Sequence, residues 1–330
     1  MKTSDMSCNA LTFCVAALTL TGCGGAGAGA IGGPPSAESG VLETLGANAV
    51  DSTMALSATP LKPAIYVANR GGDKVTAYSA NGNLALTITA GVDGPFGVAV
   101  DRAGKIYVAN SFPHSGGSVT TYTPDGKQTT PTITGGIVFP LDVVVDKRGK
   151  IYVSNLNNYS GTGFVTTYKP NGTQTTPTIT AGIAGPVGLA VDARGKIYVA
   201  NAYNNTVTTY KLDGTQTTPT ITTGLDFPTG VAVDANGKIY VANHYGGPRN
   251  NGSVTTFTPD GKQTTPTITA GMESLYGVAV DMDGKIYVAN YQGPGNKGGF
   301  GSVMTYTAEG KRITPTITKG IAAPTLLTFH

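Results

Sequence analysis

Cysteine, tryptophan, histidine and charged residues are scarce in this sequence, and these shortages exclude several kinds of site. There is no tryptophan, and the three cysteines, Cys8, Cys14 and Cys23, all precede residue 24. The remaining chain therefore has no disulfide framework, cysteine metal site or catalytic thiol. Charged residues make up 12% of the 330 positions, the net charge is +3, and lysine and arginine never cluster. This pattern argues against a nucleic-acid surface.

Long hydrophobic runs are also missing, apart from one near the N-terminus. The run ALTFCVAALTLT at 10–21 is too short to span a bilayer but has the length of a secretory signal. It leads into LTGC, ending at Cys23, which resembles the lipobox of bacterial lipoproteins. The resemblance implies a signal peptide at 1–22, lipidation of Cys23 and attachment to the cell envelope through lipid alone. Because Gly24 is not acidic, it implies the outer membrane if the organism has one. An ordinary signal peptide cleaved elsewhere remains the alternative.

The segment after this cysteine lacks any regular hydrophobic period. Residues 23–60 are rich in glycine, alanine, serine and proline. We interpret them as a flexible tether with a mean reach on the order of 30–40 Å.

The rest of the chain, 61–330, consists of repeats. The string I-Y-V-(A/S)-N occurs at 65–69, 106–110, 151–155, 197–201, 239–243 and 286–290. The sequence of each repeat unit predicts four short strands, which we call a to d from first to last. In the second unit these are FGVAVD (96–101), KIYVAN (105–110), SVTTYTPDG (118–126) and TTPTIT (129–134).

The composition of each predicted strand indicates its place in the unit. Strand a is small and apolar, as a strand buried on both faces must be. Strand b alternates in polarity, and its tyrosine (Tyr107 and its equivalents) is expected to pack between units. Strands c and d are rich in threonine, which suits strands facing water. Strand d also contains a proline, which is tolerated only at a sheet edge and blocks aggregation there. These prolines are Pro131, Pro177, Pro219, Pro266 and Pro315.

Segments such as PFGVAVDRAGKIYVAN (95–110) resemble the NHL repeat family. The resemblance implies an all-β fold, a six-bladed β-propeller of the TolB-like kind with four antiparallel strands per blade. The first IYVAN, at 65–69, has no strand a before it, and PTLLTFH (324–330) has no strand b after it. We therefore expect 324–330 to become the inner strand of the first blade and to close the ring between the two chain ends.

In a propeller, the b–c and d–a loops share one face, called here the loop face, and the a–b and c–d turns share the opposite turn face. The turn face is uniform, with repeated Asp-x-x-Gly turns. We interpret their aspartates as residues that bond the turn backbone, not as metal ligands. His330 aligns with them, so at most His114 and His244 reach the loop face, which argues against a three-histidine zinc site. The turn aspartates are Asp101, Asp146, Asp192, Asp234 and Asp281.

The loop face varies from blade to blade and carries aromatic residues among asparagine, glycine and serine. Such a surface suits sugars, peptides or a protein partner. The alternative is that these loops merely tolerate insertions. The candidate ligand-binding residues are Phe112, His114, Tyr159, Tyr203, His244, Tyr245, Arg249 and Tyr291, and Phe300 lies in the same loops.

Four acidic residues are candidates for a metal site at the mouth of the central channel. Asp93, Asp226 and Glu273 occupy equivalent d–a loop positions, and Asp142 replaces an inner-strand glycine. Grouped carboxylates would suit calcium, magnesium or a cationic ligand. The alternative is solvated loop carboxylates with one unrelated substitution. The asparagines that end strand b are expected to cap loops.

Two functions from different classes remain open. The leading hypothesis is a non-catalytic, lipid-anchored propeller that binds an envelope protein, peptide or glycan through its loop face. The alternative is a metal-dependent hydrolase or lyase, because gluconolactonase-type and streptogramin-lyase-type propellers are similar to this fold. No Ser, His and Asp set that would converge is found in the sequence. No feature excludes a purely structural surface protein.

Overall fold

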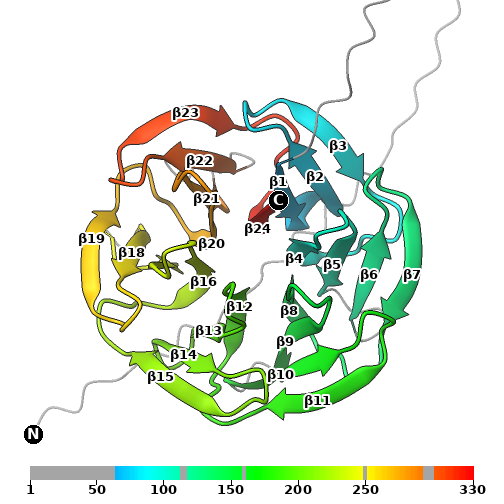
Figure 1. Cartoon of the computed structure of the whole chain (residues 1–330). Helices are drawn as coiled ribbons and strands as arrows, with labels where there is room; N and C mark the ends of the chain where they lie inside the picture. The colour runs from blue at the N-terminus through cyan, green and yellow to red at the C-terminus, as the bar shows by residue number, and fades with distance from the viewer. Residues whose placement is uncertain (1–63, 112–116, 158–160, 248–250, 293–300) are drawn as a thin grey trace, which may run out of the picture. The chain divides into compact units, whose positions relative to one another are not determined.

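The computed structural model describes residues 64–330 apart from 112–116, 158–160, 248–250 and 293–300. These residues form six four-stranded antiparallel sheets around a central axis, which is a six-bladed β-propeller (Figure 1). The described part also contains one short 3-10 helix, Arg70–Gly72, in the loop between two strands. No helix in it is both long and apolar enough to cross a membrane. Predictions outside the described residues concern 1–22, Cys23, 23–60, Phe112, His114, Tyr159, Arg249 and Phe300.

Each blade has the four predicted strands, ordered a to d from the axis outward. The inner a strands are β4 (Pro95–Val100), β8 (Pro140–Val145), β12 (Pro186–Val191), β16 (Pro228–Val233), β20 (Leu275–Val280) and β24 (Pro324–Phe329). The b strands are β1 (Ile65–Asn69), β5 (Ile106–Asn110), β9 (Ile151–Asn157), β13 (Ile197–Asn201), β17 (Ile239–Asn243) and β21 (Ile286–Asn290). The c strands are β2 (Lys74–Tyr78), β6 (Ser118–Tyr122), β10 (Thr162–Tyr168), β14 (Thr206–Tyr210), β18 (Ser253–Phe257) and β22 (Ser302–Tyr306). The d strands are β3 (Leu84–Ile88), β7 (Gln128–Ile133), β11 (Gln174–Ile179), β15 (Gln216–Ile221), β19 (Gln263–Ile268) and β23 (Arg312–Ile317).

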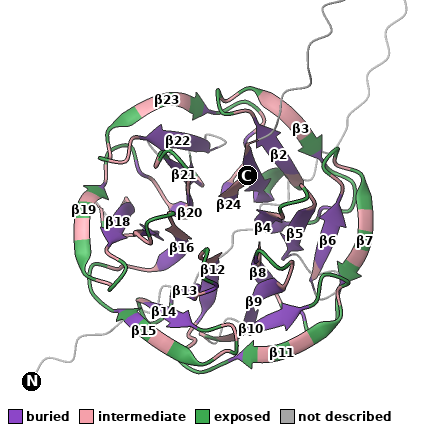
Figure 2. Ribbon diagram, in the orientation of Figure 1, coloured by how far each residue is buried: buried purple, intermediate pink, exposed green. Residues whose placement is uncertain are grey.

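Burial is lowest at the rim of the propeller and greatest in the b strands. The b strands are buried along almost their whole length, whereas the d strands are mostly exposed or intermediate up to their buried final isoleucine (Figure 2). Each d strand pairs only with its own c strand and is a sheet edge. The five prolines lie in these edge strands, as predicted, where the missing N–H breaks no ladder.

The core consists of layers between neighbouring blades. Tyr107 of β5 packs with Val143 of β8 and Ile151 of β9 in one buried cluster, so the b-strand tyrosine joins two blades as predicted. Its hydroxyl donates to Asp101 Oδ2 at 3.0 Å. Asp101 Oδ1 accepts from the backbone N–H of Ala103 at 2.9 Å and of Lys105 at 3.0 Å. The same bonds recur at the other four turn aspartates, which confirms their structural role.

The two ends of the propeller chain meet in one blade. Its strand order is β24-β1-β2-β3, and β24 pairs antiparallel with β1 from Ile65 opposite Phe329 to Asn69 opposite Pro324. Leu327 packs into a buried cluster with Ile65, and the Phe329 ring stacks on Tyr287 of the preceding blade at 5.8 Å. The predicted closure of the ring is therefore confirmed.

Deletion of 324–330 is expected to destabilise the whole propeller. It removes Leu326, Leu327 and Phe329 and uncovers β1, at a cost of about 2 kcal/mol for each large apolar side chain, against a total stability of about 5–15 kcal/mol for a typical protein. Circular dichroism melts of the full and shortened chains measure the effect. Removal of the exposed His330 alone is the control and should change the melt little. Equal melting of the full and shortened chains would contradict the closure.

Candidate functional site

Six asparagines hold the d–a loops of the loop face in place. The side-chain oxygen of each accepts a backbone N–H at 2.9–3.1 Å from the d–a loop that leads into its own blade. The amide of Asn110 also donates to Thr120 on the neighbouring c strand at 2.9 Å. The expectation that these asparagines cap loops is therefore confirmed. The six N–H donors belong to Asp93, Val138, Ala184, Asp226, Glu273 and Ala322, the positions aligned from the sequence.

The structure does not gather the four candidate metal-binding carboxylates. Asp93, Asp226 and Glu273 follow the blade repeat and belong to three separate blades, so each lies at its own place on the ring. Asp142 is buried, at 6% exposure, between two inner strands. Within the described ranges, no three His, Cys, Asp or Glu side chains lie where they could hold one metal ion.

Asp142 instead connects two neighbouring blades. Its Oδ1 accepts the N–H of Val143 and its Oδ2 accepts the N–H of Leu189 on β12, both at 2.8 Å. Burial raises the pKa of this carboxyl to about 8, and the two backbone bonds partly oppose that rise. The equivalent residue on β4 is Gly97, where an added Cβ would lie 2.6 Å from Asp142 Oδ1. The inner strands are therefore too close together here for a side chain on both.

The inner strands surround a central cavity of about 310 Å³ that Asp142 helps to line. Asp142 is the one ionisable side chain among the lining residues. The walls come from residues near the turn-face ends of the strands: Val100, Val145, Val191, Val233, Val280 and Phe329. The side chains that line the cavity are thus mostly apolar, and Asp142 is the single acid among them.

At the loop face an apolar cluster packs across the end of this channel. The cluster contains Phe96, Leu141, Val187 and Leu326, each from a different inner strand. The centres of the Phe96 ring on β4 and the Tyr276 ring on β20 lie 5.4 Å apart, in an edge-to-face arrangement. This contact bridges two blades that are separated by strand β24. These four side chains are buried, so the cluster is an apolar layer beneath the loop face.

Aromatic rings continue from this cluster across the loop face in an unbroken series. Tyr276 contacts Tyr291 at 5.1 Å and His244 at 5.0 Å. Phe227 lies 5.9 Å from His244 and 5.7 Å from Tyr245, and it contacts Tyr203 at 6.0 Å. Tyr203 is 41% exposed. We call this set the aromatic track: Phe96, Tyr203, Phe227, His244, Tyr245, Tyr276 and Tyr291.

The structure brings together four residues predicted from sequence, Tyr203, His244, Tyr245 and Tyr291, and adds three that were missed. Among these, Phe227 immediately precedes an inner strand and has a left-handed backbone, with φ of +52°. Gly94 and Gly185 occupy the same position in other blades, with φ of +52° and +60°. A bulky residue there costs roughly 1–2 kcal/mol. Phe139 occupies the same position in another blade with φ of +47°, so phenylalanine there did not by itself predict the track.

His244 lies at the centre of the track with a defined proton position. Its Nδ1 lies 3.1 Å from the carbonyl oxygen of Leu275. Because a carbonyl only accepts, Nδ1 carries the proton and Nε2 has a free lone pair. Burial lowers the pKa of His244 below its usual 6.5, so the ring is neutral at pH 7. No hydrogen bond to Nε2 is present among the described residues.

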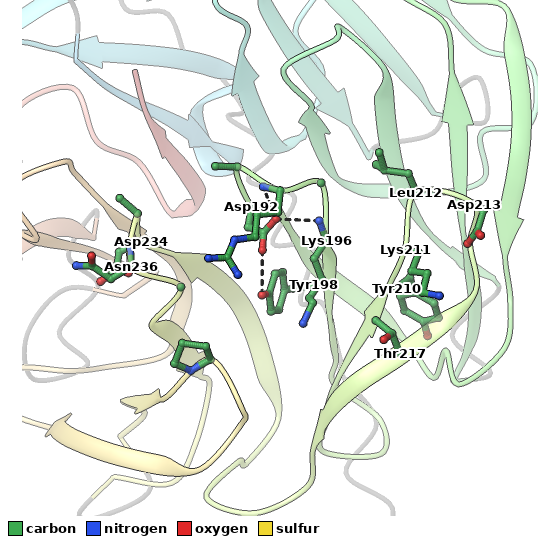
Figure 3. A pocket seen from close by; sticks show the side chains of 16 residues that line it. Asp192, Lys196, Tyr198, Tyr210, Lys211, Leu212, Asp213, Thr217, Asp234 and Asn236 are labelled. Atoms are coloured by element: carbon green, nitrogen blue, oxygen red, sulfur yellow. Dashed lines mark hydrogen bonds between the residues drawn. The ribbon is translucent and has the colours of Figure 1, made fainter.

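A larger groove, of about 680 Å³, lies on the turn face between the blades of β13 and β17 (Figure 3). Its acidic residues are engaged in the turns themselves. Asp192 accepts N–H groups from Arg194 at 2.9 Å and Lys196 at 2.8 Å, and the Tyr198 hydroxyl at 3.3 Å. Asp234 makes the corresponding bonds in the next blade. The groove is therefore the space between repeated turns, and the varied residues lie on the opposite face.

Asp142 should make stability depend on pH. An unfolded aspartate has a pKa of about 3.9, so between about pH 4 and pH 8 the unfolded chain loses a proton that the folded chain retains. This group therefore reduces stability as pH rises, by about 1.4 kcal/mol per pH unit. In Asp142→Asn this decline of stability with pH should disappear. The variant should also be less stable by a constant amount, because its amide nitrogen cannot accept the N–H that a carboxylate oxygen accepts. Denaturant unfolding at pH 5 and pH 8 measures how much stability each protein loses between the two pH values. An equal loss in wild type and Asp142→Asn would refute the raised pKa.

Comparison with protein families gives one partial match. Residues 139–273 match the family described as SMP-30/Gluconolactonase/LRE-like region, which is less than half of the chain. Among curated proteins, none matches this sequence.

Solved structures share the fold at low sequence identity. A chain of a nidogen/laminin complex is 17% identical, with 81% of this chain and 97% of that chain covered and a TM-score of 0.63. A putative gluconolactonase is 17% identical, covering 69% and 82%, with a TM-score of 0.56. Virginiamycin B lyase from Staphylococcus aureus is 16% identical, covering 72% and 75%, with a TM-score of 0.52. At these identities the similarity shows a shared fold alone. The six blades follow from the sheet topology of this chain, and an NHL-type repeat fits them in general form.

Proposed function

We propose that this propeller is a binding module of the bacterial cell envelope and that the aromatic track is its binding surface. The observation that carries the proposal is the unbroken series of ring contacts on the loop face, from Tyr203 to Phe96. Aromatic side chains supply large, rigid contact areas at low entropic cost, and they dominate the binding energy of many interfaces. The more exposed rings of the track come from three consecutive blades, which suits an extended partner.

The contrast between the two faces supports this choice of surface. On the turn face the aspartates satisfy backbone N–H groups and tyrosine hydroxyls, so their bonding capacity serves the fold. On the loop face the track residues Tyr203, Tyr245 and Tyr291 lie in b–c loops that differ in length and composition between blades. Binding residues are typically carried on such loops above a rigid scaffold.

Alanine at Tyr203, Tyr245 and Tyr291 together should reduce binding to envelope extracts by more than tenfold, because each ring is expected to contribute more than about 1 kcal/mol. Pull-downs with the full chain measure the retained material. The control is Met282→Ala, since Met282 is 93% exposed in a turn-face loop. Unchanged retention by the triple variant, with an unchanged melt, would count against the track as the binding surface.

We propose further that lipid at Cys23 and the tether at 23–60 hold the propeller at the membrane. The LTGC sequence supports this anchoring. In a bacterial host, Cys23→Ser should abolish incorporation of labelled palmitate and release the protein from the membrane fraction. Persistent labelling in Cys23→Ser would show that another residue is acylated or that the anchor is different.

A metal-dependent hydrolase or lyase is the second candidate, favoured by the family match over 139–273. The described residues do not supply three ligands for a divalent cation, so we assign no catalytic step. If a cation binds in the channel, calcium, magnesium or manganese should raise the melting temperature, and Asp142→Ala should remove the effect. A melt unmoved by all three cations would eliminate this candidate.

A further inference from the structure

We propose that the aromatic track binds a neutral carbohydrate chain and that Nε2 of His244 accepts a hydrogen bond from one of its hydroxyl groups. This inference rests on the proposed binding function and names the chemical class of its ligand. It starts from the position of the proton on His244. The Nδ1–H bond to the Leu275 carbonyl leaves Nε2 as an acceptor within a partly exposed ring. A ligand at this point must therefore supply a donor.

The charges next to the track favour a neutral ligand over an ionic one. The Arg70 guanidinium lies 5.7 Å from the centre of the Phe96 ring, and Arg70 is 8% exposed. Its positive charge acts on Tyr276, where it lowers the phenol pKa against the larger effect of burial, so it disfavours a cation at that end. At the other end, the Asp226 carboxylate acts on His244, raising its pKa against burial, and so disfavours an anion. A neutral ligand avoids both penalties.

The chemistry of the ring edges matches hydroxyl groups. The hydroxyls of Tyr245, Tyr276 and Tyr291 can each donate and accept, and His244 Nε2 accepts. Sugar hydroxyls also do both, and the C–H faces of a sugar ring stack on aromatic faces. The centres of the more exposed rings follow one another at 4.7–6.0 Å from Tyr203 to Tyr291, so successive rings can contact successive units of a chain. Phe96 is only 4% exposed and supports Tyr276 by packing against it.

The position of the Phe227 ring supports a ligand role for it. A left-handed backbone recurs immediately before the inner strand of every blade, so the φ of +52° at Phe227 belongs to the repeat and does not by itself mark a site. What distinguishes Phe227 is that its ring contacts Tyr203, His244 and Tyr245, and so joins the two halves of the track.

The experiment immobilises the full chain on a biosensor surface and measures the mass that it captures from an envelope extract. One portion of the extract is digested with protease, and another is oxidised with periodate, which cleaves vicinal diols. We expect capture to survive protease and to be lost after periodate. His244→Phe should lower capture about fivefold, because it keeps a ring but removes the acceptor. His244→Gln, which retains an acceptor, should lose less.

Two further variants separate binding from folding. Phe227→Gly relieves the left-handed backbone, so it should remain folded while capture falls, and Met282→Ala on the turn face should leave capture unchanged. Capture that is destroyed by protease but resists periodate would overturn the carbohydrate ligand and leave the binding function standing. Absence of any capture would overturn both. Equal capture by wild type and His244→Phe would overturn the role of His244.

Discussion

The pairing of β24 with β1 is the interaction on which the rest of the propeller depends. Every other blade is continuous in sequence, but this blade is assembled from the two ends of the folded chain, with Ile65 opposite Phe329. Closure of the ring gives each blade two neighbours, so both faces of each sheet are covered. It also determines the width of the channel and therefore which inner-strand positions tolerate side chains. The loop face can carry variable residues because this closed ring below it is uniform.

Close packing at the axis explains why Asp142 and Leu326 are unusual. At the equivalent positions Gly97, Gly188 and Gly230, an added Cβ would lie within 2.6–2.7 Å of the next inner strand. Asp142 is accommodated beside Leu189, whose N–H it accepts, and Leu326 extends into the apolar cluster at the loop face. One substitution thus introduces a buried acid with a raised pKa, and the other helps to close the channel end. Neither change alters the blade repeat, since each is absorbed locally.

The repeat pattern was sufficient to predict the strands, the blades, the closing strand and the structural roles of the turn aspartates and strand-b asparagines. The strands and asparagines recur in every blade and the turn aspartates in all but the closing one, so each copy supports the interpretation of the others. The site is different, because it depends on contacts between residues that differ from blade to blade. Sequence predicted Tyr203, His244, Tyr245 and Tyr291 in the track. It missed the three track residues that lie outside the b–c loops, which are Phe96, Phe227 and Tyr276. It also grouped Asp142 with Asp93, although Asp142 turns into a blade interface that alignment alone does not reveal.

Phe227 shows how stability and function separate in this molecule. The position before the inner strand has a left-handed backbone in every blade, and two other blades have glycine there, so blade formation does not require an aromatic ring. The Phe227 ring instead touches three other track residues. His244 repeats the pattern, because its Nδ1–H is used to hold the ring in place while Nε2 has no role in the described fold. The scaffold does not need these two side chains, yet residues of the scaffold hold them in fixed orientations. This combination is the physical basis for placing the binding function on the loop face.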